Sequence, residues 1–329
     1  MRILVTGGAG FIGSAFVLKT LHEMPDVEVT NVDSLTYAGN LDNLKAIESN
    51  PKYRFIHADI SDRNAMQPVF EEIKPEIVFH LAAESHVDRS IIDSGAFIRT
   101  NVLGTQVLLD CSRAVNVRRF VHISTDEVYG MLSLEDAAFT ESTKINPSSP
   151  YSASKAAGDL LAASYFHTHK FPIVITRASN NYGPRQFPEK FIPLFTTNAI
   201  QNLKLPLYGT GTNIRDWIHV NDHVNGIWLA ALKGREGEVY NLGGESERSN
   251  IEVAKEILRI LGKSESLIQY VTDRPGHDFR YAMNITKART ELGFEPKYSF
   301  KNGLEETVKW YMNNPDWWQR VKSGEYRKY

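Results

Sequence analysis

Short apolar runs rich in β-branched residues alternate with longer amphipathic stretches through the first half of the chain. The apolar runs predict strands at Arg2 to Val5, Val27 to Val32, Arg54 to His57, Ile77 to His80, Phe120 to Ile123 and Ile173 to Thr176. The amphipathic stretches predict helices near 11–24, 62–74, 93–115 and 152–170. Strands separated by helices of this length are typical of a parallel sheet covered on both faces. The pattern predicts an α/β fold built on a Rossmann-like, doubly wound parallel sheet.

The pattern changes after Asn180, where Pro and Gly become frequent. This half predicts an apolar run at Trp217 to Val220, a strand at Glu238 to Asn241 and a helix near 250–261. Long loops with few elements indicate a smaller α+β part and not a second copy of the first half. We therefore expect one domain at 1–178, to which the chain returns near 212–242, and a second domain at 179–329.

Composition and charge narrow the function classes. A length of 329 residues corresponds to about two domains of ordinary size. Thirty-seven Lys and Arg stand against 39 Asp and Glu, so the chain lacks the basic excess of nucleic-acid binders. The single cysteine, Cys111, leaves no partner for an intrachain disulfide or a thiolate metal cluster and fits a reducing compartment. We expect no nucleic-acid partner and no metal site. Cys111 lies in a predicted helix, and its side chain is predicted to pack in the core of the protein.

The N-terminal segment has one feature of a signal peptide. Ile3 to Leu18 carries no charge, as a signal peptide would, but Thr6 to Gly10 interrupts it with glycines. No run of about 20 apolar residues that could span a membrane is present. We therefore expect a cytoplasmic protein with no membrane partner. The charged segment Arg320 to Tyr329 is expected to be a solvated end.

A glycine motif follows the first predicted strand. Gly7-Gly8-Ala9-Gly10-Phe11-Ile12-Gly13 fits both G-x-x-G-x-x-G and G-x-G-x-x-G. The first glycine permits the sharp turn, Gly10 lets the backbone approach a pyrophosphate, and Gly13 allows close packing of helix on sheet. Asp33 lies twenty residues beyond Gly13, where a carboxylate accepts hydrogen bonds from ribose hydroxyls. The predicted cofactor is NAD, since a 2′-phosphate would lie against that carboxylate, and its predicted contacts are Gly7, Gly10, Phe11, Ile12, Gly13 and Asp33.

Further cofactor contacts are predicted from the ends of the third and fourth strands. Nucleotides bind at the carboxyl ends of strands in such sheets. The residues in these places are Asp59, Ile60, Leu81, Ala82 and Ala83. A role as strand-end core residues explains them almost equally well.

The candidate catalytic pair is Tyr151 and Lys155, in Ser149-Pro150-Tyr151-Ser152-Ala153-Ser154-Lys155. Residues four apart on a helix share a face. An ammonium group near a phenol stabilises the phenolate and lowers its pKa, which gives a base that works near neutral pH. The pattern Tyr-x-x-x-Lys often occurs by chance. In a chain that also carries the glycine motif, it strongly indicates a catalytic pair.

Together these motifs resemble the extended short-chain dehydrogenase/reductase family, in which Thr125 completes a hydroxyl, Tyr and Lys trio. The next two residues are carboxylic acids, Asp126 and Glu127. Elimination of water needs one base for a carbon-bound proton and one acid for the departing hydroxyl, and such a pair supplies both. Adjacent acids are otherwise an ordinary surface feature.

Within the family, the chain resembles the dTDP-glucose 4,6-dehydratases along nearly its whole length. The segments that carry this resemblance include Leu35 to Leu41, Ala82 to Ser90, Ser179 to Pro184, Phe187 to Lys190, Asn213 to Trp217 and Thr272 to Asp278. The resemblance implies C4 oxidation by Tyr151, Lys155 and Thr125, elimination of water across C5 and C6 by Glu127 and Asp126, and hydride return to C6. NAD would be regenerated in each turnover and stay tightly bound. The residues alone leave open which of the two carboxyl groups is the acid.

The resemblance also implies a substrate site and a partner. The first domain would bind NAD, with Thr100 and Asn181 as further contacts, and the second would bind the nucleotide sugar. The implied substrate contacts are Ser85, Asn180, Lys190, Phe191, Pro206, Tyr208, Arg215, Asn250, Arg274 and His277. Arg suits a diphosphate because its planar fork binds phosphate oxygens in pairs. For Lys190 and Asn250, a place on the solvated surface is the second alternative. The implied partner is a second copy of the chain, through the helices near 93–115 and 152–170.

Arg185 departs from the family pattern, which usually carries an aromatic residue or His at this place. An added guanidinium beside the pocket leaves the nucleotide base open, so a UDP-sugar 4,6-dehydratase is the first alternative. A nucleotide-sugar 4-epimerase would need Tyr151 and Lys155 but no acid for C6. An NAD-sensing protein without catalysis is the alternative from another class.

Overall fold

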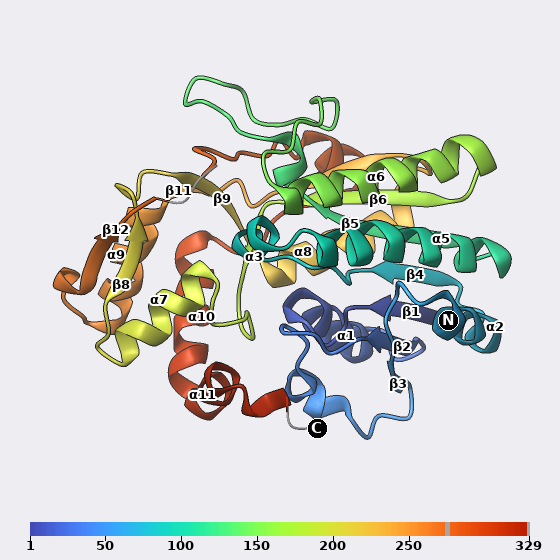
Figure 1. The fold of residues 1–329 in the computed structure, drawn as a ribbon, viewed down its shortest axis with the longest axis horizontal. Helices are drawn as coiled ribbons and strands as arrows, with labels where there is room; N and C mark the ends of the chain where they lie inside the picture. Colours follow the sequence, from blue (N-terminus) through green and yellow to red (C-terminus); the bar gives the residue numbers. More distant parts are fainter. Residues whose placement is uncertain (274–276, 328–329) are drawn as a thin grey trace.

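The fold is built on one parallel sheet of seven strands. The computed structural model describes residues 1–273 and 277–327. The strands are ordered β10-β6-β5-β4-β1-β2-β3 and are all parallel (Figure 1). Their bounds are β1 (Arg2–Thr6), β2 (Glu28–Asp33), β3 (Tyr53–His57), β4 (Ile77–His80), β5 (Arg119–Thr125), β6 (Ile173–Ala178) and β10 (Val239–Leu242). The order reverses between β1 and β4, so this is the doubly wound, Rossmann-like sheet that the sequence predicts.

Helices bury both faces of this sheet. α1 (Phe11–Glu23) and α8 (Val220–Lys233) pack on one face, and α2 (Arg63–Ile73), α5 (Thr105–Ala114) and α6 (Pro150–His169) pack on the other. Successive strand residues face opposite layers: Ile77 and Phe79 belong to the first core cluster, whereas Val78 between them belongs to the second. Strands buried on both faces need such continuous apolar runs, which explains the sequence pattern.

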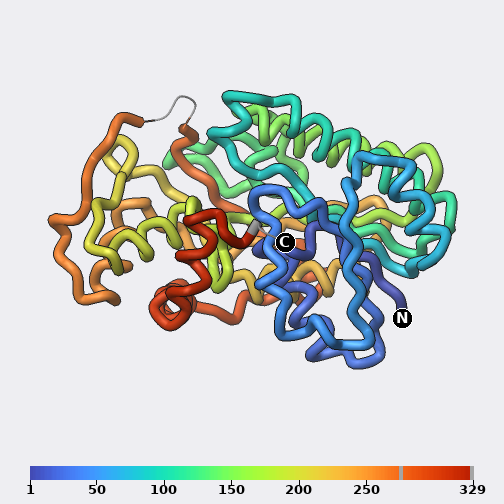
Figure 2. The backbone as a smooth tube through the Cα atoms, turned by 60° about the horizontal axis from the view of Figure 1, so that its bottom comes forward, coloured from blue at the N-terminus to red at the C-terminus, as the bar shows by residue number. Residues whose placement is uncertain are grey.

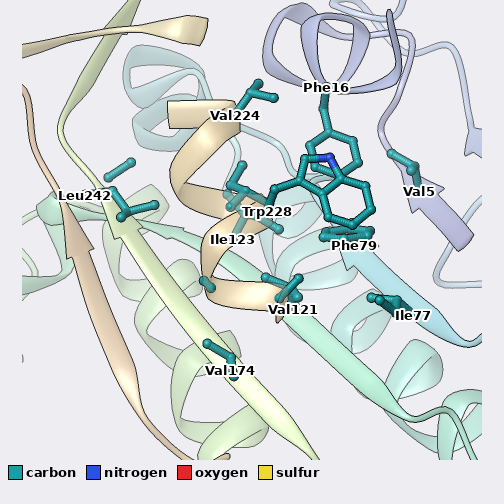
Figure 3. Packing of buried hydrophobic residues seen from close by; sticks show 14 of the residues in the cluster. Val5, Phe16, Ile77, Phe79, Val121, Ile123, Val174, Val224, Trp228 and Leu242 are labelled. Atoms are coloured by element: carbon teal, nitrogen blue, oxygen red, sulfur yellow. The ribbon is translucent and has the colours of Figure 1, made fainter. Parts of the chain in front are cut away.

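Trp228 of α8 fills the centre of one core layer (Figure 3). Its ring stacks on Phe16 of α1, with ring centroids 5.4 Å apart, and tilts against Phe79 of β4 at 4.8 Å. The indole N–H donates to Thr20 Oγ1 at 2.9 Å, so the buried polar atom is satisfied. Part of the second half of the chain therefore completes the core of the first.

The helix predicted over 93–115 is divided. The structure has α3 (Val87–Ile92), α4 (Gly95–Phe97), the π-helical segment η2 (Ile98–Gly104) and then α5. Asn101 within η2 is buried, and its side chain bonds the backbone N–H and C=O of Glu84 and the Ser154 hydroxyl at 2.8–3.0 Å. A π turn is frequent at functional sites, and here it carries Asn101 against the loop after β4.

The smaller part of the molecule surrounds a third core cluster, which includes Trp217 and Tyr182. β7 (Asn180–Tyr182), β9 (Ile214–His219) and β11 (Glu247–Ser249) form one small sheet, and β8 (Leu205–Tyr208) pairs with β12 (Ile268–Val271). α7 (Phe191–Ile200), α9 (Asn250–Leu261) and α10 (Phe300–Asn313) pack around this core. The remaining segments are η1 (Leu41–Ile47), η3 (Asp126–Tyr129), η4 (Glu265–Leu267), η5 (Ala288–Leu292), α11 (Pro315–Ser323) and η6 (Glu325–Arg327).

The prediction of a solvated tail at Arg320 to Tyr329 is wrong for its described part. Val321 is 4% exposed and Tyr326 1% exposed, because α11 turns an apolar edge inward while its charges face outward. Lys328 and Tyr329 lie outside the described residues.

The prediction for Cys111 is confirmed, since it is buried in α5. Within the described part of the chain, no helix is both long and apolar enough to cross a bilayer.

Candidate active site

One cavity lies at the carboxyl ends of the strands, where the order of the sheet reverses. Every residue predicted from sequence to contact the cofactor lines this cavity. They are Gly7, Gly10, Phe11, Ile12, Gly13, Asp33, Asp59, Ile60, Leu81, Ala82, Ala83, Thr100, Tyr151, Lys155 and Asn181. The strand-end residues, for which a core role was the alternative, therefore face the cavity.

Two glycines of the glycine loop, Gly7 and Gly13, leave no room for a side chain. Gly7 has φ +74°, a conformation that side chains rarely adopt, and a Cβ on Gly13 would lie 2.1 Å from the Gly7 carbonyl oxygen. A Cβ on Gly10 would meet only that oxygen, at 3.3 Å. Gly10 precedes α1, and no side chain of the described residues caps this helix. Its first N–H groups thus point to an anion, which fits the pyrophosphate of a dinucleotide.

Asp33 closes the other side of this loop. One carboxylate oxygen accepts the N–H of Ala9 at 2.9 Å, and the other accepts the N–H of Leu35 at 2.9 Å. Burial raises the pKa of Asp33, and these two bonds oppose the rise. A carboxylate oxygen accepts more than one bond, so ribose hydroxyls fit here and a 2′-phosphate does not.

Tyr151 and Lys155 lie in the first turns of α6, both buried against β5. Ser149 and Ser152 form a capping box, with Pro150 in the first turn, so the start of this helix is fixed locally. Lys155 Nζ donates to the Ile123 carbonyl oxygen at 2.7 Å. Burial lowers the pKa of Lys155 to about 8, and the Asp159 carboxylate opposes this shift.

The expected lowering of the Tyr151 pKa is not found. Burial raises the pKa of this phenol well above its usual value, and the charges of Glu127 and Asp126 add to the rise. A hydrogen bond with Thr125 acts in the opposite direction. The helical spacing of Tyr151 and Lys155 cannot reveal this burial, which comes from packing against other elements.

The two candidate acids begin the short helix η3 directly after β5. Thr125 Oγ1 caps the helix by accepting the Glu127 N–H at 3.2 Å and donates to Asp126 Oδ1 at 3.1 Å. Asp126 is 2% exposed, and its Oδ2 has no hydrogen-bond partner among the described residues. Burial, followed by the charge of Glu127, raises the pKa of Asp126 well above its usual value. Asp126 thus favours the protonated form.

Three predicted substrate residues line the same cavity, namely Ser85, Asn180 and Lys190. Lys190 Nζ donates to the Ser85 carbonyl oxygen at 2.9 Å, which joins the substrate part to the loop after β4. Asn180 Oδ1 is buried with no hydrogen-bond partner within residues 1–273 and 277–327. It is available to a donor in the cavity.

The other predicted substrate residues that the structure describes do not line this cavity. Arg215 of β9 is buried, and its guanidinium donates to the carbonyl oxygens of Ile214 and Asp278 at 2.7 and 2.9 Å. Arg274 lies outside the described residues. Phe191 packs on Phe195 and Trp217, Pro206 and Tyr208 lie in β8, Asn250 begins α9, and His277 lies beside Asp273 and Tyr208. Their roles remain predictions.

Several lining residues were missed by sequence reasoning. His223 lies inside α8, and its Nδ1 is 2.9 Å from Asn181 Oδ1, a contact across 42 residues. Trp317 of α11 reaches the cavity from the far end of the chain. Tyr37, Gly39 and Asn40 also line it, and only their place in a segment with family resemblance could have indicated them.

A family model described as GDP-mannose 4,6 dehydratase matches residues 4–307. The chain belongs to this family. A dTDP-glucose 4,6-dehydratase of Streptomyces niveus is 51% identical over 327 residues, covering 98% of this chain and 96% of the relative. The predicted resemblance is therefore confirmed.

Solved structures agree with the fold. A dTDP-glucose 4,6-dehydratase from Bacillus anthracis, in complex with NAD, has a TM-score of 0.92 and 47% identity and covers 98% of this chain and 99% of that chain. A UDP-glucose 4-epimerase from Thermotoga maritima, solved with UDP-glucose, has a TM-score of 0.89 and 32% identity, covering 96% and 100%. The fold is shared by both activities, so the side chains of the site must distinguish them.

Proposed function

We infer that this chain is a hydro-lyase that converts dTDP-glucose into dTDP-4-keto-6-deoxyglucose, with NAD as its cofactor. The observation that carries this function is the pair Asp126 and Glu127 beside Tyr151, in the cavity that the glycine loop also lines. An epimerase needs the tyrosine and lysine but no acid for C6. Relatives 51% and 49% identical to this chain carry the name dTDP-glucose 4,6-dehydratase.

NAD would be held by the glycine loop and Asp33, which fit a pyrophosphate and a ribose, respectively. Bound there, NAD would supply a reversible hydride acceptor for the oxidation at C4 and the reduction at C6. Because the cofactor is regenerated in each turnover, no external oxidant is needed.

Tyr151 is the proposed base for the C4 hydroxyl proton. Its interaction with Thr125 lowers the pKa of Tyr151 and so opposes the rise that burial causes. Lys155 keeps a positive charge behind it at neutral pH, since the pKa of Lys155 is about 8. The 4-ketone that results makes the proton on C5 acidic.

Asp126 is the proposed acid and Glu127 the proposed base of the elimination. The raised pKa of Asp126 keeps its proton available for the C6 hydroxyl, which leaves as water. Glu127 takes the C5 proton and returns it to C5 at the end. The proton accepted by Tyr151 balances the one that Asp126 gives up, so the net products are water and the 4-keto-6-deoxy sugar.

Asn180 and Lys190 are the proposed contacts to the nucleotide sugar from the second domain, and Ser85 lies opposite them. Lys190 supplies a positive charge for the diphosphate, and Asn180 offers an acceptor that bonds no other residue in the described part of the chain. The domain division at residue 178 is part of this proposal: the larger unit holds NAD, the smaller holds the sugar nucleotide, and the chemistry occurs between them.

A homodimer and a cytoplasmic location complete the proposal. The exposed large apolar side chains include Ile91 and Ile92 of α3, Ile98 and Leu103 of η2 and Leu160 of α6. α3 and η2 both contact α6, so we propose these side chains as one interface. Ile92 is 87% exposed, and Ile92→Glu should lower the mass measured by light scattering to that of the monomer. The cytoplasmic location rests on the single buried cysteine.

The function is tested by incubating the purified protein with dTDP-glucose and no added NAD, with UDP-glucose as the matched substrate because Arg185 lines the cavity. The expected product is the 4-keto-6-deoxy sugar nucleotide, detected by mass spectrometry as a loss of water. A C4 epimer without loss of water would favour the epimerase. No product from either sugar, even with NAD supplied, would contradict the proposal.

A further inference from the structure

The segment Pro315–Tyr326, named here the clasp, crosses from the smaller part of the molecule to the cofactor part. α10, which precedes it, packs on α7 and α9. Figure 2 shows the clasp, in dark red, beside the blue loop that follows β2, and Figure 1 shows the same proximity. The clasp therefore connects the two sides of the cavity by a route separate from the catalytic residues.

Three contacts of the clasp reach one short stretch of that loop, residues 37–43. Trp317 Nε1 donates to Asn43 Oδ1 at 3.0 Å, and Arg320 forms an ion pair with Asp42 at 3.1 Å. The Tyr326 hydroxyl donates to the carbonyl oxygen of Tyr37. This stretch lines the cavity at Tyr37 and Asn43, and Trp317 itself lines it.

The contact at Asn43 continues into the glycine loop. Asn43 is 4% exposed, and its Nδ2 donates to the Ala9 carbonyl oxygen at 3.0 Å. The N–H of Asn40 donates to the same oxygen at 3.0 Å, while the Ala9 N–H is bound by Asp33. Two hydrogen bonds thus join the Trp317 indole to the backbone that fits the pyrophosphate.

We propose that the clasp is part of the NAD site and that Trp317 is a positioning residue, which acts through Asn43 to hold the glycine loop and slow the release of NAD. The inference rests on the proposed function for the identity of the cofactor. It adds a physical reason for retention through the redox cycle: release requires the loop 37–43 to move, and the clasp ties that loop to the other half of the molecule.

The test measures NAD release in the absence of any nucleotide sugar. Protein loaded with NADH is mixed with excess NAD in a stopped-flow instrument, and the loss of NADH fluorescence gives the dissociation rate. Trp317→Phe keeps an aromatic ring, although a smaller one, and removes the N–H donor, so the rate should rise roughly threefold to tenfold, as expected for one lost hydrogen bond. Lys309→Ala is the matched control, because Lys309 pairs with Glu305 on the exposed surface of α10.

A double-mutant cycle shows whether Trp317 acts through Asn43. In an Asn43→Ala background, Trp317→Phe should add little to the release rate, because the connection is already broken. Additive effects would contradict the proposed route. A Trp317→Phe protein with a lower Tm but the wild-type release rate would overturn the proposal and leave a structural role. Since no sugar is present, these results are independent of the dehydratase activity.

Discussion

The two sides of the cavity are built in different ways. On the cofactor side the wall is backbone and small side chains, such as Gly10, Gly13 and Ala82, fixed by close packing at strand ends. On the substrate side the wall is long polar side chains held by carbonyl oxygens far away in sequence, as Lys190 is held by Ser85. The cofactor side should lose stability or NAD affinity when side-chain atoms are added to it. The substrate side should lose substrate affinity when a charge is removed from it.

The catalytic group at the boundary should show the largest effect. Tyr151→Phe removes the only proposed base for C4 oxidation, so kcat should fall by a factor of about 10² to 10⁴. Steady-state turnover of dTDP-glucose measures this, with retained NAD content as the control for an intact cofactor side. Turnover at the wild-type rate would show that the site is assigned wrongly.

Asp126→Asn should lower kcat by a factor of about 10² to 10⁴, because an amide cannot protonate the leaving hydroxyl.

The Asp126→Asn variant should also be more stable than the wild type at neutral pH. Folding raises the pKa of Asp126, so the folded state binds more protons, and wild-type stability falls as pH rises from about 4 toward the raised pKa. The Tm of the variant should therefore exceed that of the wild type above pH 4, and the two Tm values should converge below pH 4. A gap that widens toward acid would contradict the burial of this carboxyl.

On the cofactor side, Gly13→Ala and Gly10→Ala form a matched pair. The added Cβ of Gly13→Ala would lie 2.1 Å from a backbone oxygen, so we expect a loss of about 1–3 kcal/mol in the free energy of unfolding. At Gly10 the nearest atom is 3.3 Å away, so stability should change little while NAD binding weakens. Chemical denaturation and NADH titration distinguish the two, and equal losses of stability would argue against this loop geometry.

On the substrate side, Lys190→Met keeps the length of the side chain and removes its charge. KM for dTDP-glucose should rise about tenfold, since a charge-assisted contact to the diphosphate is lost, while the NADH dissociation rate stays near that of the wild type. Steady-state kinetics with both readouts checks this. An equal effect on cofactor and substrate binding would contradict the assignment of Lys190 to the substrate side.

The smallest effect is a pH dependence. Because the pKa of Lys155 is about 8, the ammonium loses its proton as pH rises through 8, and kcat should decline above that value. Lys155→Arg stays charged over this range and should lack that decline, at a lower overall rate. A wild-type profile that stays flat to pH 10 would show that the lysine charge is not used.

Local sequence patterns were sufficient for much of the cofactor side, because the glycine loop and Asp33 belong to one strand–turn–helix–strand unit and the pair on α6 belongs to one helix start. Thr100 and Asn181 were indicated only by the family resemblance. Local patterns were insufficient where distant segments meet. His223 and Trp317 reach the cavity from α8 and α11 with no motif around them. The predicted fall in the Tyr151 pKa failed for the same reason, since its burial depends on elements far from α6. The solvated tail was mistaken because charges on one face of α11 concealed Trp318 and Val321 on the other.

The central claim is that one cavity carries out oxidation, loss of water and reduction with a cofactor that does not leave. dTDP-glucose labelled with deuterium at C4, incubated with the purified protein and no added NAD, tests it most directly. We predict that the deuterium is found at C6 of the 4-keto-6-deoxy product, by NMR or fragment mass. Product with unlabelled C6 would contradict the closed cycle.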